Sequence, residues 1–253
     1  MTSALGLTAA DGQRALQEAV KRLIVDRGLA PGALLPTETE LMRELGVSRN
    51  RLREAMKALQ AIGIVEIRHG HGTYVGSVSL SALQAGLEFR TSLSVGGDLR
   101  DVRDLLHVRE VLEAGLVQEV LAVADELDYA TLERAVATME ENARGGWHSP
   151  EADWLFHRTL YEPLDNAFVT QLLQVFWSVF NKLSDQLARE IEDPRITARW
   201  HRSILSAVRA GDAEAVGTAM RDHFEGIRAR LAATPVTRAA ARTSPRRRAR
   251  RGP

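Results

Sequence analysis

The chain contains no cysteine among its 253 residues. This absence excludes disulfide bonds, thiolate metal sites and cysteine nucleophiles together, and it is typical of a reducing compartment. No apolar run reaches the length of a membrane span, and the first residues lack the basic and apolar segments of a secretion signal. We therefore expect a soluble, cytoplasmic protein that is not attached to a membrane.

A net charge of one sign is also missing, but the formal charge of zero hides a segregation. Residues 1–78 carry 10 Lys/Arg against 8 Asp/Glu, and residues 79–234 carry 16 against 25. Residues 235–253 carry 7 Arg and no acid, with almost no large apolar side chain. The pattern predicts an N-terminal domain, an acidic second domain and a basic disordered tail. The tail is either a solubilising end or a segment attracted to nucleic acid phosphates.

The first 78 residues read as helix, helix, tight turn, helix and hairpin. Four apolar residues at helical spacing predict a first helix that ends near Gly28, namely Leu16, Val20, Leu23 and Ile24. Thr37 and Glu40 form a capping box, which predicts a short second helix that stops at Gly46. Ser48 is an N-cap only two residues later, so the second and third helices form a helix-turn-helix.

The third helix divides its side chains between two faces. The apolar face consists of Leu52, Ala55, Met56, Leu59 and Ile62, and the polar face of Arg49, Asn50, Arg51, Arg53 and Lys57. Arginine can pair with guanine, asparagine with adenine, and lysine with phosphate. The hairpin that follows has His69, Gly70, His71 and Gly72 at its tip, and its glycines permit close approach to DNA. A solvated basic helix face is the alternative, but the order of elements favours DNA binding.

From about residue 79 the periodicity is helical throughout, which predicts an all-α domain of six or seven helices. The expected helices are 82–93, 100–124, 128–144, 150–162, 167–192, 195–209 and 213–232. The fold class is therefore mainly α with a small β-wing: a winged helix-turn-helix at 1–78, a helical bundle at 79–234 and a tail at 235–253.

Three of these helices place ionisable residues on their apolar stripes. Asp153 and His157 share a stripe with Phe156 and Leu160, while His201 and His223 lie on the stripes of two later helices. Each histidine taken alone is explained by a hydrogen bond within the core. Burial of an unpaired carboxylate is costly, however, and a divalent cation would compensate it while binding several imidazoles. Spacing leaves both interpretations open.

Arg109 is a further charge on an inward helix face, because it shares that face with Leu105, Leu112 and Leu116. One interpretation is an intrahelical ion pair with Glu113 at i+4. The other is a guanidinium that binds the carboxylate of a ligand held by the metal.

The stretch PGALLPTETELMRELGVSRNRLREAMKALQAIGIVEIRHGHGTYV strongly resembles the winged helix-turn-helix of the GntR family of bacterial transcription regulators. The resemblance implies operator contacts from Ser48, Arg49, Asn50, Arg51 and Arg53 in the recognition helix, and from His69 and Gly70 in the wing. Some relatives have a base-reading arginine where this sequence has Thr39, so the operator sequence does not transfer.

The later motifs D-W-L-F-H, L-D-N, H-R-S-I-L-S-A-V-R-A-G-D-A-E-A-V and R-D-H-F resemble the FadR-type (FCD) effector domain. The resemblance spans about residues 12–232. It implies a divalent metal, with zinc, nickel and manganese all suitable, bound by Asp153, His157, His201 and His223. It also implies an effector-binding role for Arg109, and for Asn166 at a position where the family's G-N is D-N here.

We therefore expect a homodimeric, ligand-responsive transcription regulator, a repressor rather than an enzyme, that binds a palindromic operator on double-stranded DNA. A small organic acid is the expected effector. The alternatives are a metal-dependent hydrolase fused to a DNA-binding module, and a sensor of the metal itself. Against the hydrolase, no further carboxylate is recognisable as a general base.

Overall fold

The computed structural model describes residues 9–188 and 193–235. The chain divides into two compact units, residues 1–86 and 87–253, and the division falls within helix α4 (Ser81–Val95). The boundary expected between residues 78 and 79 precedes this helix. Except for Pro235, the Arg-rich tail lies outside the described residues.

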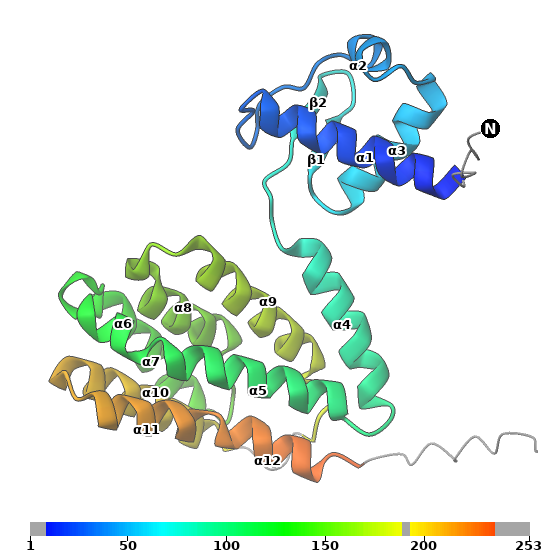
Figure 1. Ribbon diagram of the computed structural model, residues 1–253. Helices are drawn as coiled ribbons and strands as arrows, with labels where there is room; N and C mark the ends of the chain where they lie inside the picture. Colours follow the sequence, from blue (N-terminus) through cyan, green and yellow to red (C-terminus); the bar gives the residue numbers. More distant parts are fainter. Residues whose placement is uncertain (1–8, 189–192, 236–253) are drawn as a thin grey trace, which may run out of the picture. The chain divides into compact units, whose positions relative to one another are not determined.

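The described part of the N-terminal unit contains three helices and a hairpin in the predicted order (Figure 1). They are α1 (Ala9–Asp26), α2 (Glu38–Leu45), α3 (Arg49–Ala61), β1 (Val65–Arg68) and β2 (Gly72–Val75). One buried apolar cluster joins them, built largely from Val20, Leu23, Ile24, Leu41, Leu52, Met56, Leu59, Val65 and Val75. The predicted stripes of the first and third helices therefore form the core of this unit.

The helix-turn-helix begins at the predicted capping box. The Thr37 hydroxyl accepts a hydrogen bond from the Glu40 backbone N–H at 3.3 Å, and the Glu40 carboxylate accepts one from the Thr37 N–H at 2.8 Å. Gly46 ends α2 with φ of 63°, a left-handed conformation that favours glycine. Ser48 occupies the N-cap position of α3, but its side chain makes no capping hydrogen bond.

Ile62 departs from the prediction for the third helix, since it is 47% exposed rather than buried. Helix α3 ends at Ala61, and Ile62 is the C-cap residue with φ of −104° and ψ of 10°. Side-chain directions past the last turn no longer follow the 3.6-residue period, so the apolar spacing does not predict burial at residue 62.

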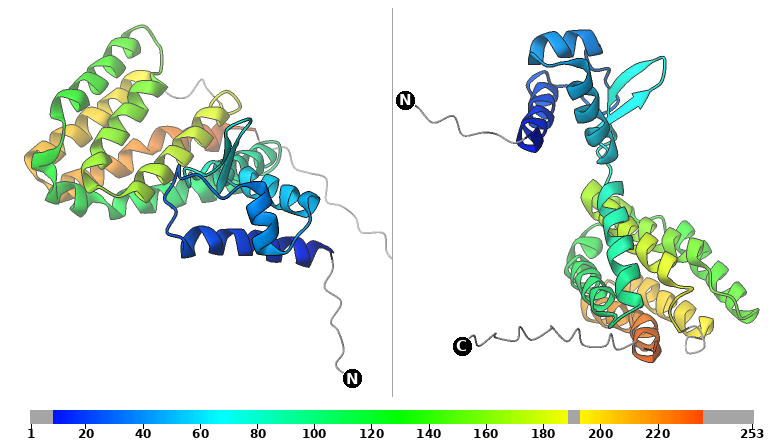
Figure 2. Two further views of the ribbon diagram at one scale, coloured as in Figure 1. Left: turned by 90° about the horizontal axis from the view of Figure 1, so that it is seen from above. Right: turned by 90° about the vertical axis from the view of Figure 1, so that its right-hand side faces the viewer.

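The hairpin is antiparallel, with Val65 paired to Val75 and Arg68 to Gly72. It projects from the helices of its unit, as Figure 2 shows in its right-hand view. Leu34 adds an isolated bridge to Tyr74, so the loop before α2 also supports the hairpin. The tip is the short segment between the two strands, which matches the predicted wing.

The second unit is helical at all seven predicted places, but two of the expected helices are each divided. Its described elements are α4 (Ser81–Val95), α5 (Arg100–Gly115), α6 (Val117–Ala122), η1 (Ala124–Glu126), α7 (Tyr129–Arg144), α8 (Pro150–Tyr161), η2 (Glu162–Leu164), α9 (Ala167–Leu183), α10 (Pro194–Ala210), α11 (Ala213–His223) and α12 (Glu225–Ala233). Nine α-helices are thus present from residue 81 onward in the described ranges, more than the six or seven expected. At the breaks, Leu116 and Phe224 both have ψ of −6°, which interrupts the hydrogen-bond ladder without changing the apolar period.

The helix expected at 167–192 ends earlier, at Leu183, and residues 189–192 lie outside the described part of the chain. Among the described helices, none is both long and apolar enough to cross a membrane.

Helix α7 positions the elements that carry the ionisable stripes, because it packs against both α8 and α10, and α10 packs against α11. The apolar members of these stripes are buried, including Phe156, Leu160, Ile204, Leu205 and Met220. Since each polar member lies on the same face as buried apolar neighbours, the packing directs all of them towards the interior of the unit.

Candidate functional site

Four ionisable side chains from three helices meet inside the C-terminal unit. Helix α8 supplies Asp153 and His157, α10 supplies His201, and α11 supplies His223. One potential ligand atom from each residue lies within 4.8 Å of the others. The two residues His157 and His201 are fully buried, whereas Asp153 and His223 keep some exposure. The structure therefore brings together the four residues that the sequence only placed on separate stripes.

The closest atoms within this metal-ligand cluster are ring nitrogens and one carboxylate oxygen. The Nε2 atoms of His157 and His223 are 3.1 Å apart. The Asp153 Oδ1 atom lies 3.0 Å from His201 Nε2 and 3.8 Å from His157 Nε2. Imidazole nitrogen with carboxylate oxygen is a donor set that suits divalent transition metals.

The hydrogen bond of His201 outside the cluster indicates which tautomer it adopts. Its Nδ1 atom lies 2.8 Å from the carbonyl oxygen of Thr197. A carbonyl can only accept, so Nδ1 carries the proton, and in the neutral ring Nε2 presents a lone pair. This lone pair faces the Asp153 oxygen, and the buried Nε2 atom has no well-directed hydrogen bond among the described residues. In the neutral ring two lone pairs face each other and repel. Either a proton on Nε2, which makes an ion pair with Asp153, or a metal ion between the two atoms removes this repulsion, so the donors fit a metal ion.

A second buried carboxylate, that of Glu113 on α5, lies behind His157. Its Oε1 atom accepts a hydrogen bond from Arg109 Nε at 2.6 Å, and its Oε2 atom accepts one from the Tyr161 hydroxyl at 3.0 Å. The same Oε2 atom lies 3.2 Å from His157 Nδ1, although the two are not aligned as a well-directed hydrogen bond. Glu113 has no exposed surface, so all its contacts are within the protein.

The surroundings of these groups shift their pKa values in directions that favour a bound cation. Burial alone would raise the pKa of Asp153, but His201 and His157 outweigh it and hold that pKa below its ordinary value. Burial would also raise the pKa of Glu113, and Arg109 and His157 lower it. Burial, followed by His201 and His157, lowers the pKa of His223. The carboxylates are therefore ionised and His223 is neutral at pH 7, as metal binding requires.

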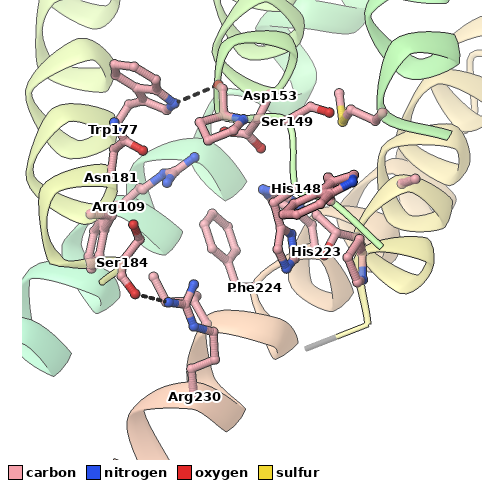
Figure 3. Close-up of a pocket in the computed structure, with 18 of the residues that line it drawn as sticks. Arg109, His148, Ser149, Asp153, Trp177, Asn181, Ser184, His223, Phe224 and Arg230 are labelled. Carbon is pink, nitrogen blue, oxygen red and sulfur yellow. Dashed lines mark hydrogen bonds between the residues drawn. The ribbon is translucent and has the colours of Figure 1, made fainter. Parts of the chain in front are cut away.

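A cavity of about 540 Å³ opens beside the cluster. Asp153 and His223 line it, and α9 contributes Trp177, Phe180 and Asn181 (Figure 3). The volume lies within the range of small-molecule sites, which are usually apolar with a few polar groups. A small molecule in this cavity would therefore be in direct reach of the candidate metal ligands.

Arg109 forms the ion pair of the first interpretation, and it also lines the cavity. It forms the i+4 ion pair with Glu113 through Nε, and only 8% of its surface is exposed. It also lines the cavity, where its guanidinium lies 5.3 Å from the Phe224 ring centroid. Its two terminal nitrogens make no hydrogen bond within residues 9–188 and 193–235. The ion pair is therefore confirmed, and the ligand-binding interpretation stays a prediction.

Asn166 has a different place from the one predicted. It is the exposed N-cap of α9, where its side-chain oxygen accepts hydrogen bonds from the backbone N–H groups of Phe168 and Val169. It does not line the cavity. The structure gives Asn166 a capping role, which an asparagine before a helix commonly has, and the effector role stays a prediction that this cavity does not support.

The five recognition-helix residues predicted to contact the operator are all exposed at the start of α3, namely Ser48, Arg49, Asn50, Arg51 and Arg53. Glu38 from α2 holds two of them. Its carboxylate accepts hydrogen bonds from Arg53 at 2.6 and 3.1 Å and lies 3.9 Å from Arg49. The Arg51 guanidinium donates to the backbone oxygen of Gly12 at 3.2 Å. The helix thus presents Asn50 together with a row of partly restrained arginines.

The wing residues His69 and Gly70 are exposed at the tip of the hairpin. Gly70 has φ of 78°, which allows the chain to turn there with little cost. Next to the tip, the Arg68 guanidinium lies 4.3 Å from the Tyr74 ring centroid and also pairs with Glu66. The tip therefore extends from a strand pair that is reinforced by side-chain contacts.

Two features of the site do not follow from the sequence pattern. Glu113 was considered only as a partner of Arg109, although it also contacts Tyr161 and His157. The α9 residues Trp177 and Asn181 were not singled out, yet they line the cavity. The sequence carries a partial signal only for Glu113, because its i+4 spacing from the inward Arg109 predicts an ion pair but not the contacts with Tyr161 and His157.

Two family models match the chain. The model described as bacterial regulatory proteins, gntR family, matches residues 13–75. The FCD domain model matches residues 104–226. The first match contains the helix-turn-helix and the wing, and the second contains all four residues of the metal-ligand cluster.

Individual relatives support the same assignment. The Uxu operon regulator of Haemophilus influenzae is 30% identical over 210 residues, which cover 79% of this chain and 74% of the relative. The Uxu operon transcriptional regulator of Escherichia coli strain K12 is 28% identical over 234 residues, which cover 88% of this chain and 89% of the relative. A solved structure titled Streptococcus agalactiae GntR shares 28% identity with a TM-score of 0.59, covering 86% of this chain and 99% of its own. These matches are to transcription regulators, not to enzymes.

Proposed function

The chain belongs to the GntR family of bacterial regulatory proteins and carries an FCD domain, and from this premise we propose a homodimeric regulator whose operator binding responds to a metal-bound carboxylate. Repression is the expected mode of regulation, in which binding of the effector causes the protein to dissociate from its operator. Operator binding would take place in the bacterial cytoplasm.

The observation that carries the proposal is the convergence of Asp153, His157, His201 and His223 beside a cavity, in a chain that also has a winged helix-turn-helix. One carboxylate and three imidazoles at a common point in the core would destabilise the fold if they had no shared partner, because each group loses hydration on burial. A bound metal ion gives these donors a shared partner.

The proposed partner of the N-terminal unit is a palindromic operator. A two-fold dimer presents two recognition helices, and these read two half-sites related by the same symmetry. Selection of binding sequences from a randomised duplex library tests this. We expect enrichment of an inverted repeat, whereas enrichment of an isolated half-site or of no sequence would contradict the proposal.

Arg49→Ala and Arg53→Ala are each expected to weaken binding to the selected operator by roughly 5- to 150-fold, because each exposed arginine would read a base or bind a phosphate. Arg144→Ala is the matched control, since Arg144 is exposed and paired with Glu141 in the C-terminal unit. Fluorescence anisotropy with labelled operator measures the effect. If both α3 variants bind the operator with wild-type affinity, this helix is not the element that contacts the operator bases.

The proposed metal ligands are the four residues of the cluster, and zinc, nickel and manganese all suit them. When bound, the ion supplies positive charge and coordination positions that a ligand's oxygens can occupy. Neighbouring residues orient the ligand side chains. The Thr197 carbonyl holds the ring of His201, and Glu113 lies at the outer nitrogen of His157.

The proposed effector is a small carboxylate such as a hydroxy acid, a dicarboxylate or a sugar acid. Its carboxylate would reach the metal position beside Asp153 and His223, and the outer edge of the Arg109 guanidinium would pair with a remaining oxygen. The aromatic side chains of Trp177 and Phe180 would contact the body of the molecule. A coupling free energy of about 1–3 kcal/mol between effector and operator is enough for regulation.

Two other functions make different demands on the same site. A direct metal sensor would change operator affinity with metal alone, without any acid. A hydrolase would turn over substrate, but the second carboxylate near the cluster, Glu113, already accepts hydrogen bonds from Arg109 and Tyr161. Titration of operator binding first with metal and then with acids separates the proposed function from the sensor, and a turnover assay separates it from the hydrolase.

A further inference from the structure

We propose that Glu113 is a positioning residue that fixes the tautomer of His157, and thereby sets how tightly the cluster binds its metal. The proposal rests on the proposed metal site, but its first test does not need a metal. Glu113 touches no ligand in the cavity and acts only through the imidazole. It therefore differs in kind from the four candidate ligands.

The Glu113 carboxylate is held in place by its hydrogen bonds and lies next to the outer nitrogen of His157. Both oxygens face donors, Arg109 Nε at 2.6 Å and the Tyr161 hydroxyl at 3.0 Å, so the carboxylate is held from two sides. His157 Nδ1 is buried and lies 3.2 Å from the Oε2 atom, without the alignment of a well-directed hydrogen bond, and it makes no hydrogen bond elsewhere among the described residues. An ionised carboxylate only accepts, so it favours the proton on Nδ1. The Nε2 atom then presents its lone pair to the cluster.

The other end of the ring shows why the tautomer matters. His157 Nε2 lies 3.8 Å from Asp153 Oδ1 and 3.1 Å from His223 Nε2. A proton on Nε2 would occupy the space in which the metal has to bind. Carboxylates that hold the outer nitrogen of a metal-binding histidine typically change metal affinity by 10- to 100-fold when they are replaced.

Glu113→Gln tests the proposal because the amide keeps the shape but has only one accepting atom. Arg109 is always protonated and needs an acceptor at Nε, so the amide oxygen faces Arg109 and the NH₂ group faces His157. The amide then donates to Nδ1, and the proton of the ring moves to Nε2. We expect the variant to bind zinc about 10- to 100-fold more weakly than the wild type.

The direct readout is the ¹⁵N spectrum of histidine in metal-free protein, at a mildly alkaline pH above the ordinary histidine pKa of about 6.5. The wild type is expected to show His157 with the proton on Nδ1, and Glu113→Gln with the proton on Nε2. Glu110→Gln is the matched control on the same helix, since Glu110 pairs with Arg228 away from the cluster. It should leave both the tautomer and the zinc affinity unchanged.

The outcomes separate this proposal from the proposed function. If wild-type His157 carries its proton on Nε2, the proposal is wrong, and this result does not depend on whether any variant folds. An unchanged tautomer and zinc affinity within twofold in Glu113→Gln would also overturn it. If the protein binds no metal but the tautomer depends on Glu113 as expected, the role of Glu113 in fixing the tautomer stands, while its effect on metal affinity and the metal function both fail.

Discussion

His201→Ala is expected to purify without its divalent metal ion, whereas the wild type purified without chelators retains close to one ion per chain. The side chain supplies an Nε2 atom 3.0 Å from Asp153 Oδ1, and the Thr197 carbonyl holds it in the orientation that presents a lone pair. When one of the four protein ligands is lost, the three that remain bind the metal ion too weakly to retain it against hydration in water. Elemental analysis of both proteins measures the effect, and added metal should not restore binding in the variant.

Two further variants keep this test specific. His201 is fully buried, so its removal also leaves a small void, and Asp153→Asn provides a replacement of nearly equal volume that removes a charged ligand. His107→Ala is the matched control, because His107 is exposed on α5. Circular dichroism should show similar helix content in all of them. Full metal content in both cluster variants would show that these residues are not metal ligands and only make hydrogen bonds within the core.

The second large effect is expected at Arg109. In Arg109→Ala, the affinity for carboxylate effectors should fall by roughly 30-fold or more, because one partner of a largely buried charged pair is removed. Arg109→Lys should recover only part of it, since lysine lacks the fork that can hold Glu113 and a ligand at once. Calorimetry with a panel of organic acids measures binding to the metal-loaded proteins.

The control for this prediction is a change in the ligand. The primary amide of the best acid lacks the negative charge, so it should bind weakly and almost equally to the wild type and to Arg109→Ala. Metal content should be measured in parallel, because Arg109 also contacts Glu113 beside the cluster. An acid that binds the wild type and the alanine variant equally well would remove Arg109 from the effector site.

The sequence predicted the fold wherever one local rule decided the structure. The capping box at Thr37 and Glu40 and the glycine at residue 46 fixed the limits of α2, and the apolar period identified the buried face of each long helix. The same rule failed at helix ends. Ile62 was assigned to a stripe beyond the last turn, and the breaks at Leu116 and Phe224 leave the period intact, so the pattern could not reveal them.

The site was predictable to the extent that it depends on helix faces. The inward positions of His157 and His201 follow from their apolar neighbours, and the structure then supplies the convergence of three helices that spacing alone left open. Glu113 could not be identified from local pattern, because its contact with Tyr161 joins residues 48 positions apart. The Asn166 prediction came from the resemblance and not from periodicity, and local geometry gives that residue a capping role.

Operator binding by metal-loaded and metal-free protein, each titrated with the same panel of carboxylates, tests whether metal, effector and DNA binding are coupled. Anisotropy of a labelled operator found by selection reports the affinity in every case. The account expects at least one acid to change operator affinity by about 5- to 150-fold in the metal-loaded protein and to have no effect after the metal is removed. An equal response in metal-free protein, or no response to any carboxylate in the metal-loaded protein, would contradict it.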